Sequence, residues 1–336
     1  MRIAILSTVY KTTPPKGYGG IERVVHILVE QLVKEGNEVI LFATPGSRCS
    51  GKTIEIPAYD SSKAPSSIHS KADIISEEPL YTAVSNFLKK EKVDIIHDWS
   101  FQNLFILRHP DEFPFIISTC IPPGPDYKRP NLVACSRAHA ELCGGPTKYV
   151  YYGLDLDNWP FNLKKTEPFI HISKVARYKG QHIAIKAAKK SGSQLVLAGN
   201  IADRMYYNFI IKPMLLLSPG ITYIGEIKGT NEYLQKAAAL IQTPRWFDAF
   251  PLVNLEAFAS GTPVISLSEG GVPEQIANGL NGFLCNDTDE LADAMANIGS
   301  IKPKDCRDYA EEHFSAKRMA KDYIDLYKKA TNGENW

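Results

Sequence analysis

Two carboxylates that stand eight positions apart, Asp248 and Glu256, enclose the stretch of this sequence best suited to chemistry. Pro251 suits the first turn of a short helix, where a missing backbone N–H costs nothing. The amides of Leu252 and Val253 would then point out of the helix N-terminus, where the helix dipole favours an anion. Glu256 lies about one turn further on and leans back toward that end. The segment predicts a site that holds a phosphate through amides and the neighbouring ribose diol through a carboxylate, as the donor part of a nucleotide sugar requires.

A basic segment lies at 173–180, between an apolar run that predicts a strand and a helical pattern. Its three cations, Lys174, Arg177 and Lys179, fall within six residues. Such cations would neutralise a diphosphate. They lower the barrier most when a leaving nucleoside diphosphate gains negative charge in the transition state. The alternative is a solvated basic turn without a ligand.

Two glycine-rich segments, 17–22 and 268–274, each precede a predicted helix. Gly19 and Gly20 would let a ligand touch backbone N–H groups at a helix N-terminus, beyond the carboxyl end of the first strand. In the second segment the glycines precede Pro273, which predicts another amide-lined helix start. A flexible turn and a plain helix cap are the alternatives.

A histidine, His97, lies at the end of a short strand-like run at 94–97, which predicts a strand of the first half. At that position it could face a cleft between domains and hydrogen-bond a sugar hydroxyl or a phosphate. The alternative is a histidine that serves only the local structure.

The elements that must position these residues follow one pattern. Short apolar runs alternate with helical patterns along nearly the whole chain, which predicts parallel sheets with helices on both faces. The clearest helix covers 21–33, where apolar residues recur at i, i+3, i+4, i+7 and i+8. Segment 44–78 is expected to be mostly loop. Later helices are expected at 181–190, 203–217, 230–238, 252–260, 273–278, 289–298 and 316–329.

Composition limits the class of protein. The 336 residues predict two domains of about 150 residues each. Lys and Arg total 38 and Asp and Glu total 37, so the net charge offers no bulk attraction to nucleic acid or to an anionic membrane. No apolar run approaches the roughly 20 residues that span a bilayer, and the start of the chain is unlike a signal peptide, so the cytoplasm is the predicted location. The six cysteines show no CxxC spacing, which predicts reduced thiols.

Six segments in this order resemble the family 4 retaining glycosyltransferases, which have the GT-B fold. The matching segments are 18–25, 94–97, 152–157, 174–180, 248–256, and 270–274 with 279–284. The resemblance implies an α/β protein of two Rossmann-like domains that face each other across a cleft. Residues 1–152 would form the acceptor-side domain and 153–312 the nucleotide-sugar donor domain. A C-terminal helix, at about 313–332, would return to the first domain.

The resemblance also implies how the nucleotide is held. Glu256 would bind the ribose hydroxyls of the donor. Lys179, with Lys174 in the position of the family's arginine, would hold the diphosphate. The base would lie near Tyr223 and Glu226. A UDP- or GDP-linked sugar is the expected donor substrate, and neither a metal nor another cofactor is implied, because cations and helix dipoles take the role of Mg²⁺.

Further roles concern the sugar and the acceptor. The sugar pocket would be lined by Asp248, Ala249 and Phe250. His97 would contact the transferred sugar, and the backbone at Gly19 and Gly20 would approach the phosphates. The acceptor would be a glycan, a lipid or a small molecule.

Four positions depart from the family pattern. Asp248 stands for a glutamate, Lys174 for an arginine, Ser173 for a glycine and Cys120 for a histidine. The changes at 120, 174 and 248 motivate a second hypothesis, a non-catalytic or weakly active protein that binds sugar nucleotides or glycans on a degenerate GT-B scaffold. An NAD-dependent oxidoreductase is a third hypothesis, which the lack of a GxGxxG pattern disfavours.

Overall fold

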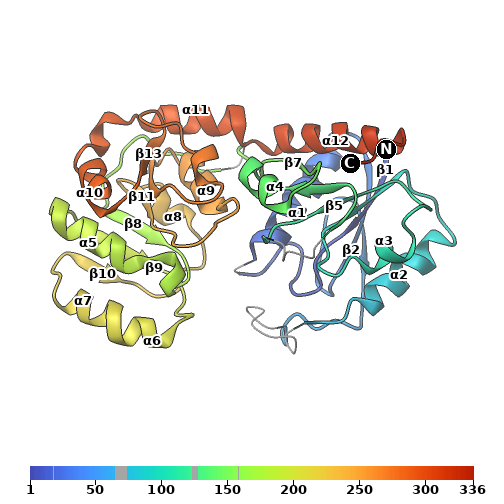
Figure 1. The fold of residues 1–336 in the computed structure, drawn as a ribbon, viewed down its shortest axis with the longest axis horizontal. Helices are drawn as coiled ribbons and strands as arrows, with labels where there is room; N and C mark the ends of the chain where they lie inside the picture. Colours follow the sequence, from blue (N-terminus) through green and yellow to red (C-terminus); the bar gives the residue numbers. More distant parts are fainter. Residues whose placement is uncertain (18, 65–73, 123–127, 158) are drawn as a thin grey trace. The chain divides into compact units, whose positions relative to one another are not determined.

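The chain forms two compact units, shown in a computed structural model that describes residues 1–336 except 18, 65–73, 123–127 and 158 (Figure 1). Unit 1 comprises Met1–Gly153 with Ala316–Trp336, and unit 2 comprises Leu154–Ser315. Each unit contains one parallel sheet flanked by helices. The predicted pair of Rossmann-like domains is therefore confirmed.

Unit 1 is built on a seven-stranded parallel sheet with the order β3-β2-β1-β4-β5-β6-β7. The strand order reverses between β1 and β4, and such a reversal is where open α/β sheets bind ligands, beyond the carboxyl ends of the strands. The strands are β1 (Arg2–Leu6), β2 (Glu38–Ala43), β3 (Lys52–Glu55), β4 (Ile95–Asp98), β5 (Phe115–Ser118), β6 (Leu132–Ala134) and β7 (Lys148–Tyr149).

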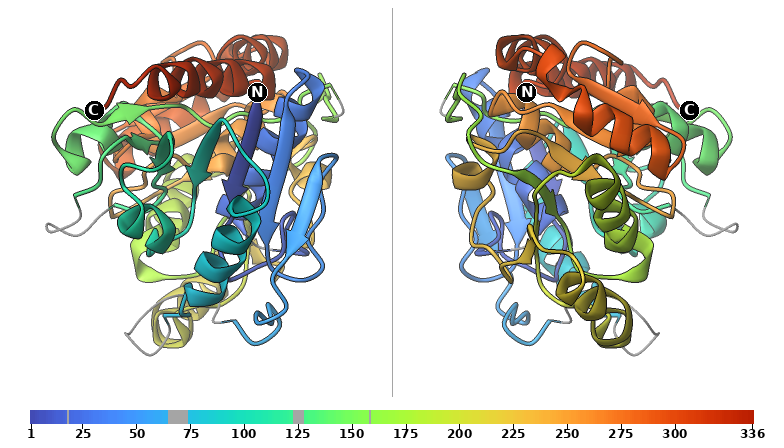
Figure 2. Two further views of the ribbon diagram at one scale, coloured as in Figure 1. Left: turned by 90° about the vertical axis from the view of Figure 1, so that its right-hand side faces the viewer. Right: turned by 90° about the vertical axis from the view of Figure 1, so that its left-hand side faces the viewer.

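Helices cover the sheet of unit 1. They are α1 (Gly20–Lys34), α2 (Glu78–Leu88), α3 (Leu104–Arg108), α4 (Arg137–Cys143) and α12 (Ala316–Thr331). Helix α2 contacts β2 and lies in front of the strands in the left panel of Figure 2. Helix α1 buries the predicted stripe, including Val25, Leu28 and Leu32.

The C-terminal helix α12 belongs to unit 1, as the resemblance implied, and it contacts α1, β4 and β5. Its apolar face is almost fully covered, with Met319, Ala320, Tyr323 and Tyr327 each at most 1% exposed. The helix is shorter than the expected 313–332. Burial of this face packs the C-terminal helix against the sheet of unit 1, which also contains the first strand of the chain.

Unit 2 is built on a six-stranded parallel sheet with the order β10-β9-β8-β11-β12-β13. Its strand order reverses between β8 and β11. The strands are β8 (Phe169–Ile172), β9 (Leu195–Ala198), β10 (Ile221–Tyr223), β11 (Leu240–Gln242), β12 (Val264–Leu267) and β13 (Gly282–Cys285). The helices are α5 (Gln181–Ser191), α6 (Arg204–Tyr206), α7 (Lys212–Leu216), α8 (Asn231–Leu234), α9 (Leu252–Ala259), α10 (Thr288–Ala296) and α11 (Pro303–His313).

Some expected elements differ in the structure. The loop expected at 44–78 contains the edge strand β3. The helix expected at 203–217 is divided into α6, a π-helical turn at Tyr207–Ile211 and α7. Proline lacks the N–H of a regular α-helical bond, and a wider turn before Pro213 fits that loss.

The helix expected at 273–278 is reduced to a single 3-10 turn, Val272–Glu274. The side chain of Asn281 explains why it stops, because its amide oxygen accepts from Ala277 N at 2.8 Å and its amide nitrogen donates to Gln275 O at 3.1 Å. Backbone groups that would continue a helix are therefore already bonded to this side chain. The helix expected at 230–238 is likewise only one turn, α8.

Two further observations concern the predicted compartment. Within the described residues, no helix combines the length and the apolar character needed to cross a membrane. All six cysteines are described, and each is a free thiol.

Candidate functional site

The residues expected to hold the donor lie at the carboxyl end of the unit 2 sheet. Lys174 follows β8, and Lys179 lies in a 3-10 turn, Arg177–Lys179, just before α5. Asp248 follows β11 and precedes α9. Because β8 and β11 adjoin at the point where the strand order reverses, these loops meet at the edge where α/β sheets bind ligands.

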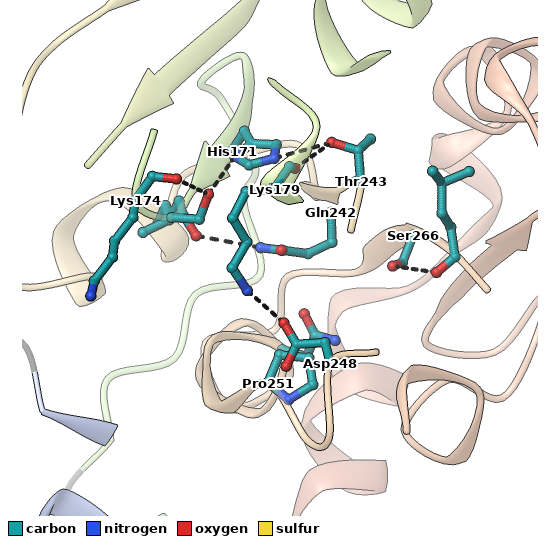
Figure 3. A network of polar contacts seen from close by, with 12 residues as sticks. His171, Lys174, Lys179, Gln242, Thr243, Asp248, Pro251 and Ser266 are labelled. Carbon is teal, nitrogen blue, oxygen red and sulfur yellow. Dashed lines mark hydrogen bonds and ion pairs between the residues drawn. The ribbon is translucent and has the colours of Figure 1, made fainter. Parts of the chain in front are cut away.

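An ion pair joins the two loops. Lys179 Nζ lies 2.6 Å from Asp248 Oδ2, and the two side chains are 19% and 15% exposed (Figure 3). The Lys179 ammonium also lies 5.5 Å from the ring centre of Trp246 and 5.8 Å from that of Tyr178. Such rings attract a cation through their electron-rich faces. A lysine in this setting has a defined position and a partner that stabilises its charge.

Gly180 positions the Lys179 loop. Its φ of +69° is in the left-handed region, and a Cβ at this position would lie 2.1 Å from the carbonyl oxygen of Thr243. The Thr243 hydroxyl in turn lies 3.1 Å from Lys179 O and 2.9 Å from Gly180 O. The loop after β8 is therefore pressed directly against the end of β11, and only glycine allows this approach.

His171 supports the same contact from β8. Its Nε2 lies 3.2 Å from the Thr243 hydroxyl (Figure 3). Burial lowers the pKa of His171 to about 4, so the ring is neutral near pH 7. A neutral ring beneath the loop leaves the positive charge of the site to its lysines and arginine.

The paired glycines of the second glycine-rich segment hold the backbone of Asp248. Gly270 has φ of +59°, and a Cβ there would lie 2.3 Å from Asp248 O. Gly271 N donates to the same carbonyl at 2.9 Å. The segment was expected to offer amides at a helix start. Instead, the Gly271 amide serves Asp248 and only a short 3-10 turn follows.

Helix α9 begins at Leu252, and Pro251 precedes it as the N-cap residue rather than lying in its first turn. The amides of Leu252 and Val253 lie in that first turn, where helix geometry provides no intrahelical acceptor. Gln275 fixes this end, since it donates to Pro251 O at 3.1 Å and accepts from Asn254 Nδ2 at 2.8 Å. The amide-bearing end of α9 is therefore held in place by a buried side chain.

Glu256 lies in the middle of α9 and is only 2% exposed. Its Oε2 accepts a hydrogen bond from the Thr230 hydroxyl at 2.8 Å, just before α8. A ribose diol at this carboxylate would share or replace the contact with Thr230. The buried carboxylate is therefore hydrogen-bonded to the residue that immediately precedes α8.

Lys174 and its neighbour Ser173 are anchored through their backbone and hydroxyl groups. Gln181 Nε2 donates to Lys174 O at 2.8 Å and to Ser173 Oγ at 3.0 Å. A Cβ on Gly199 would lie 1.9 Å from Ser173 O, so β9 approaches this loop closely. In Figure 3 the Lys174 ammonium ends away from the pair formed by Lys179 and Asp248.

The other residues expected around the donor have distinct surroundings. Tyr223 donates its hydroxyl hydrogen to Gly199 O at 2.7 Å, while Glu226 is exposed. Ala249 is buried, and the ring of Phe250 packs edge-on against Phe314 with centroids 5.8 Å apart. The Phe250 side chain therefore contributes to packing, and its backbone is what lies beside Asp248.

In unit 1, the glycine segment forms the start of α1. Gly19 is the N-cap residue, and Gly20 is the exposed first residue of the helix. A Cβ on Gly19 would lie 2.7 Å from Pro15 Cβ and 3.0 Å from Glu22 Oε2, so the backbone is tightly enclosed. Thr8 donates a hydrogen bond to the buried Glu22 carboxylate and links β1 to α1. Residue 18 lies outside the described residues.

His97 has a different environment from the one expected. The side chain is 0% exposed, its Nδ1 lies 2.7 Å from the Tyr327 hydroxyl, and its Nε2 lies 2.8 Å from Ser118 Oγ. Burial holds the pKa of His97 well below its usual range, so the ring is neutral. Both nitrogens are engaged inside unit 1. The ring therefore offers no open nitrogen to a sugar in this arrangement and serves to dock α12.

Three residues of the site were not visible in the sequence patterns. They are Thr230, Thr243 and Gln275, which contact the predicted residues from elements distant in the chain. Small polar side chains of this kind are too frequent to stand out without a structure.

Among the described residues there is also no cluster of three or more His, Cys, Asp or Glu side chains that could hold a metal ion.

Known proteins are similar to this chain in sequence and in fold. Residues 156–313 match the family described as glycosyl transferases group 1. The chain is 30% identical over 135 residues to a D-inositol 3-phosphate glycosyltransferase of Mycobacterium avium, which covers 38% of the chain and 32% of that protein. It is 26% identical over 183 residues to an alpha-maltose-1-phosphate synthase of Mycolicibacterium smegmatis, which covers 48% of the chain and 47% of that protein. The matches thus span about a third to a half of the length of these curated relatives.

Solved structures show the fold. The crystal structure of AviGT4, a glycosyltransferase involved in avilamycin A biosynthesis, aligns over 100% of this chain and 99% of its own, with a TM-score of 0.80 and 23% identity. The structure of HepE from Anabaena in complex with UDP-glucose aligns over 98% and 100%, with a TM-score of 0.68 and 16% identity. The fold of this chain is therefore GT-B.

Proposed function

Because residues 156–313 match the family described as glycosyl transferases group 1, we propose that this chain transfers a hexose from a nucleoside-diphosphate sugar to an acceptor hydroxyl. The observation that carries the proposal is the pairing of Lys179 with Asp248 beside the N-terminus of α9, at the strand-order reversal of unit 2. Cations and helix amides there suit a diphosphate, and Glu256 suits the ribose beside it. UDP or GDP is the proposed nucleotide, and the UDP-glucose bound to the HepE structure favours UDP.

The proposed reaction retains the configuration of the anomeric carbon. The acceptor oxygen forms its bond to the anomeric carbon on the face from which the diphosphate departs. The bond between that carbon and the β-phosphate oxygen breaks, and the nucleoside diphosphate leaves with the electron pair. The acceptor proton passes to a β-phosphate oxygen, so no nucleophilic side chain is needed.

Charge stabilisation is the proposed contribution of unit 2. Lys179, Lys174 and the first amides of α9 would bind the diphosphate, whose charge grows as the bond breaks. Asp248 would accept a hydrogen bond from a sugar hydroxyl while it holds Lys179 in place. We further propose that these groups make a divalent metal unnecessary, and that the acceptor binds unit 1.

The shorter side chain at position 248 does not favour a non-catalytic role. Aspartate is one methylene shorter than the glutamate of the family pattern, yet its carboxylate still reaches Lys179 at 2.6 Å. The ion pair therefore forms with the shorter side chain, and the proposal of an enzyme stands ahead of a degenerate binding protein.

A panel of UDP-, GDP- and ADP-sugars tests the proposal with the full chain. The release of nucleoside diphosphate is measured with and without EDTA, and NMR of the transferred product reports its anomeric configuration. We expect release with one nucleotide class, unaffected by EDTA, and retained configuration. If no nucleotide sugar is hydrolysed or raises the melting temperature, the proposed function is wrong.

A further inference from the structure

Unit 1 contains a cavity of about 280 Å³ among its described residues. Its wall is rich in large apolar side chains, which include Tyr10, Ile21, Trp99, Phe101, Ile121 and Pro122. The cavity lies beyond the carboxyl ends of β1, β4 and β5, where the strand order of this sheet reverses. That is the edge at which an open α/β sheet binds its ligand.

Three polar side chains of the cavity wall, Ser118, Gln102 and Thr119, are hydrogen-bonded within the protein. Ser118 Oγ lies 2.8 Å from His97 Nε2 and 3.0 Å from the Tyr323 hydroxyl. Gln102 Nε2 donates to Ile75 O at 2.6 Å, and Thr119 Oγ1 donates to Ile121 O at 3.0 Å. What the wall presents to a ligand is therefore mainly apolar surface, whereas a bare sugar needs many polar partners.

The surroundings of the cavity also disfavour an anion, and none of the residues in its described wall is charged. The loop that forms one side is held by Glu77, whose carboxylate accepts from Phe101 N at 2.8 Å and from Gln102 N at 2.9 Å. Asp98, fully buried, accepts from Ser100 N at 2.8 Å. These two buried carboxyl groups supply no positive charge that would attract a phosphate.

Cys120 is a further uncharged residue of the cavity wall. It lines the cavity at the position where the resembled family has a histidine, so a side chain able to carry positive charge is replaced by a thiol. Burial raises the pKa of Cys120 to about 12, and the thiol is therefore neutral. The wall offers a small polarisable group at this point.

We propose that this cavity binds the acceptor through an uncharged apolar ring, stacked among Tyr10, Trp99 and Phe101. The inference rests on the proposed function, since it assigns the acceptor class of the same enzyme. Pockets for drug-sized ligands span roughly 300–1,000 Å³, so a cavity of about 280 Å³ suits one ring or a fused pair of rings rather than a whole oligosaccharide. The acceptor hydroxyl would be carried on or next to that ring. Such an acceptor would differ from the phosphorylated compounds in the names of the mycobacterial relatives, inositol 3-phosphate and maltose 1-phosphate.

Three probes of one sugar separate the possibilities when titrated against the full chain by NMR. They are phenyl β-D-glucoside, methyl β-D-glucoside and glucose 6-phosphate. Because the phenyl ring buries apolar surface in the cavity, we expect the phenyl glucoside to bind about tenfold more tightly than the methyl glucoside. Glucose 6-phosphate should bind no better than the methyl glucoside. Equal affinity for the two glucosides, or tighter binding of the phosphate, would overturn the inference.

A charge placed in the wall provides the second test. Ile121 lines the cavity and is 48% exposed, so Ile121→Lys should fold normally while bringing a cation to the ring. The matched control is Leu142→Lys, since Leu142 is 51% exposed in α4 of the same unit and does not line the cavity. We expect the preference for the phenyl glucoside to vanish in the first variant and to persist in the second. An unchanged preference in Ile121→Lys would contradict the assignment.

Donor binding is measured on the same samples with UDP and GDP. Intact donor hydrolysis without any preference for the phenyl glucoside would overturn this inference alone. A clear ring preference in a protein that neither binds nor hydrolyses a donor would overturn the proposed function and leave a ring-binding cavity.

Discussion

Lys179 Nζ and Asp248 Oδ2 lie 2.6 Å apart, although 69 positions separate the two residues in the chain. The contact joins the loop after β8 to the loop after β11. It exists because Gly180 lets its loop meet Thr243 and because Gly270 and Gly271 hold the backbone of Asp248. A cation held in this manner needs little reorganisation to stabilise a leaving diphosphate.

Loss of the lysine should mainly affect turnover. In Lys179→Ala we expect the rate of hexose transfer to fall about 100-fold, equivalent to about 3 kcal/mol of lost transition-state stabilisation. The matched control is Lys190→Ala, which removes the exposed ion pair between Lys190 and Asp289 in the same unit. The control should change neither the rate nor the melting temperature noticeably. Equal rates for Lys179→Ala and the unmodified protein in a steady-state assay would show that the site is elsewhere.

The close approach at Gly180 should make that position intolerant of any side chain. Gly180→Ala should lower the free energy of unfolding by at least about 2 kcal/mol more than Gly192→Ala, as measured by urea denaturation. Both glycines have φ near +70°, at +69° and +68°, so the backbone cost of alanine, about 1 kcal/mol, is shared. Only at Gly180 does the new Cβ meet a backbone atom, whereas nothing lies within 4 Å at Gly192. Similar losses in the two variants would rule out the tight contact with Thr243.

The buried carboxyl of Glu77 should make stability depend on pH. Burial raises the pKa of Glu77 from 4.5 to about 7, so near neutral pH the folded protein keeps a proton that the unfolded chain releases. The stabilisation is complete below the unfolded value and is lost as pH rises through the folded value. We expect the free energy of unfolding to fall by about 3 kcal/mol between about pH 4.5 and pH 7 on account of this group.

Glu77→Gln should flatten that dependence in urea denaturation series at several pH values. Asp98 would still contribute at lower pH, because burial raises its pKa to about 6. The neighbouring exposed residue gives the control: Glu78 is paired with Arg108, and Glu78→Gln should leave the slope above about pH 5 unchanged. A slope between about pH 6 and pH 7 that survives in Glu77→Gln would mean that this carboxyl is ionised in the folded protein.

The docking of α12 through His97 predicts a stability effect at the far end of the chain. Tyr327→Phe removes the hydroxyl that lies 2.7 Å from His97 Nδ1 and leaves a buried nitrogen without that partner. We expect the free energy of unfolding to fall by about 1–2 kcal/mol. Tyr149→Phe is the matched control, because that side chain is 42% exposed. Thermal unfolding that gives equal melting temperatures for both variants would contradict a structural role for His97.

Sequence patterns predicted the parts of this molecule that depend on local periodicity. The apolar stripe at 21–33 predicted α1, and the alternation of strands and helices predicted two Rossmann-like units. Helix α11 was not predicted, because only Cys306 and Ala310 of its residues are buried and the apolar stripe is therefore too sparse. The edge strand β3 was missed because it is short and polar, and no residue of it is fully buried.

The site depended on contacts that no local pattern encodes. The grouping of Lys179 with Asp248 was expected from the resemblance, but the supporting contacts of Thr230, Thr243 and Gln275 join elements far apart in the sequence. For His97, the sequence suggested a contact with the sugar, whereas the structure places the ring in the interior of unit 1. The sequence suggests that His97 could bind a ligand, but in the fold its Nδ1 contacts Tyr327 of α12 and its Nε2 contacts Ser118 of β5. The cytoplasmic location and the identity of the sugar stay predictions.

Calorimetric titration of UDP and GDP into the unmodified chain and into Glu256→Gln tests the central claim most directly. Glutamine keeps the contact with Thr230 but lacks the negative charge that would bind the ribose hydroxyls. We predict micromolar binding of one nucleotide and affinity about tenfold weaker in Glu256→Gln, with Glu232→Gln, at an exposed position of α8, as the unaffected control. Binding that is absent for both nucleotides, or equal in all three proteins, would contradict a nucleotide site at the carboxyl end of the unit 2 sheet.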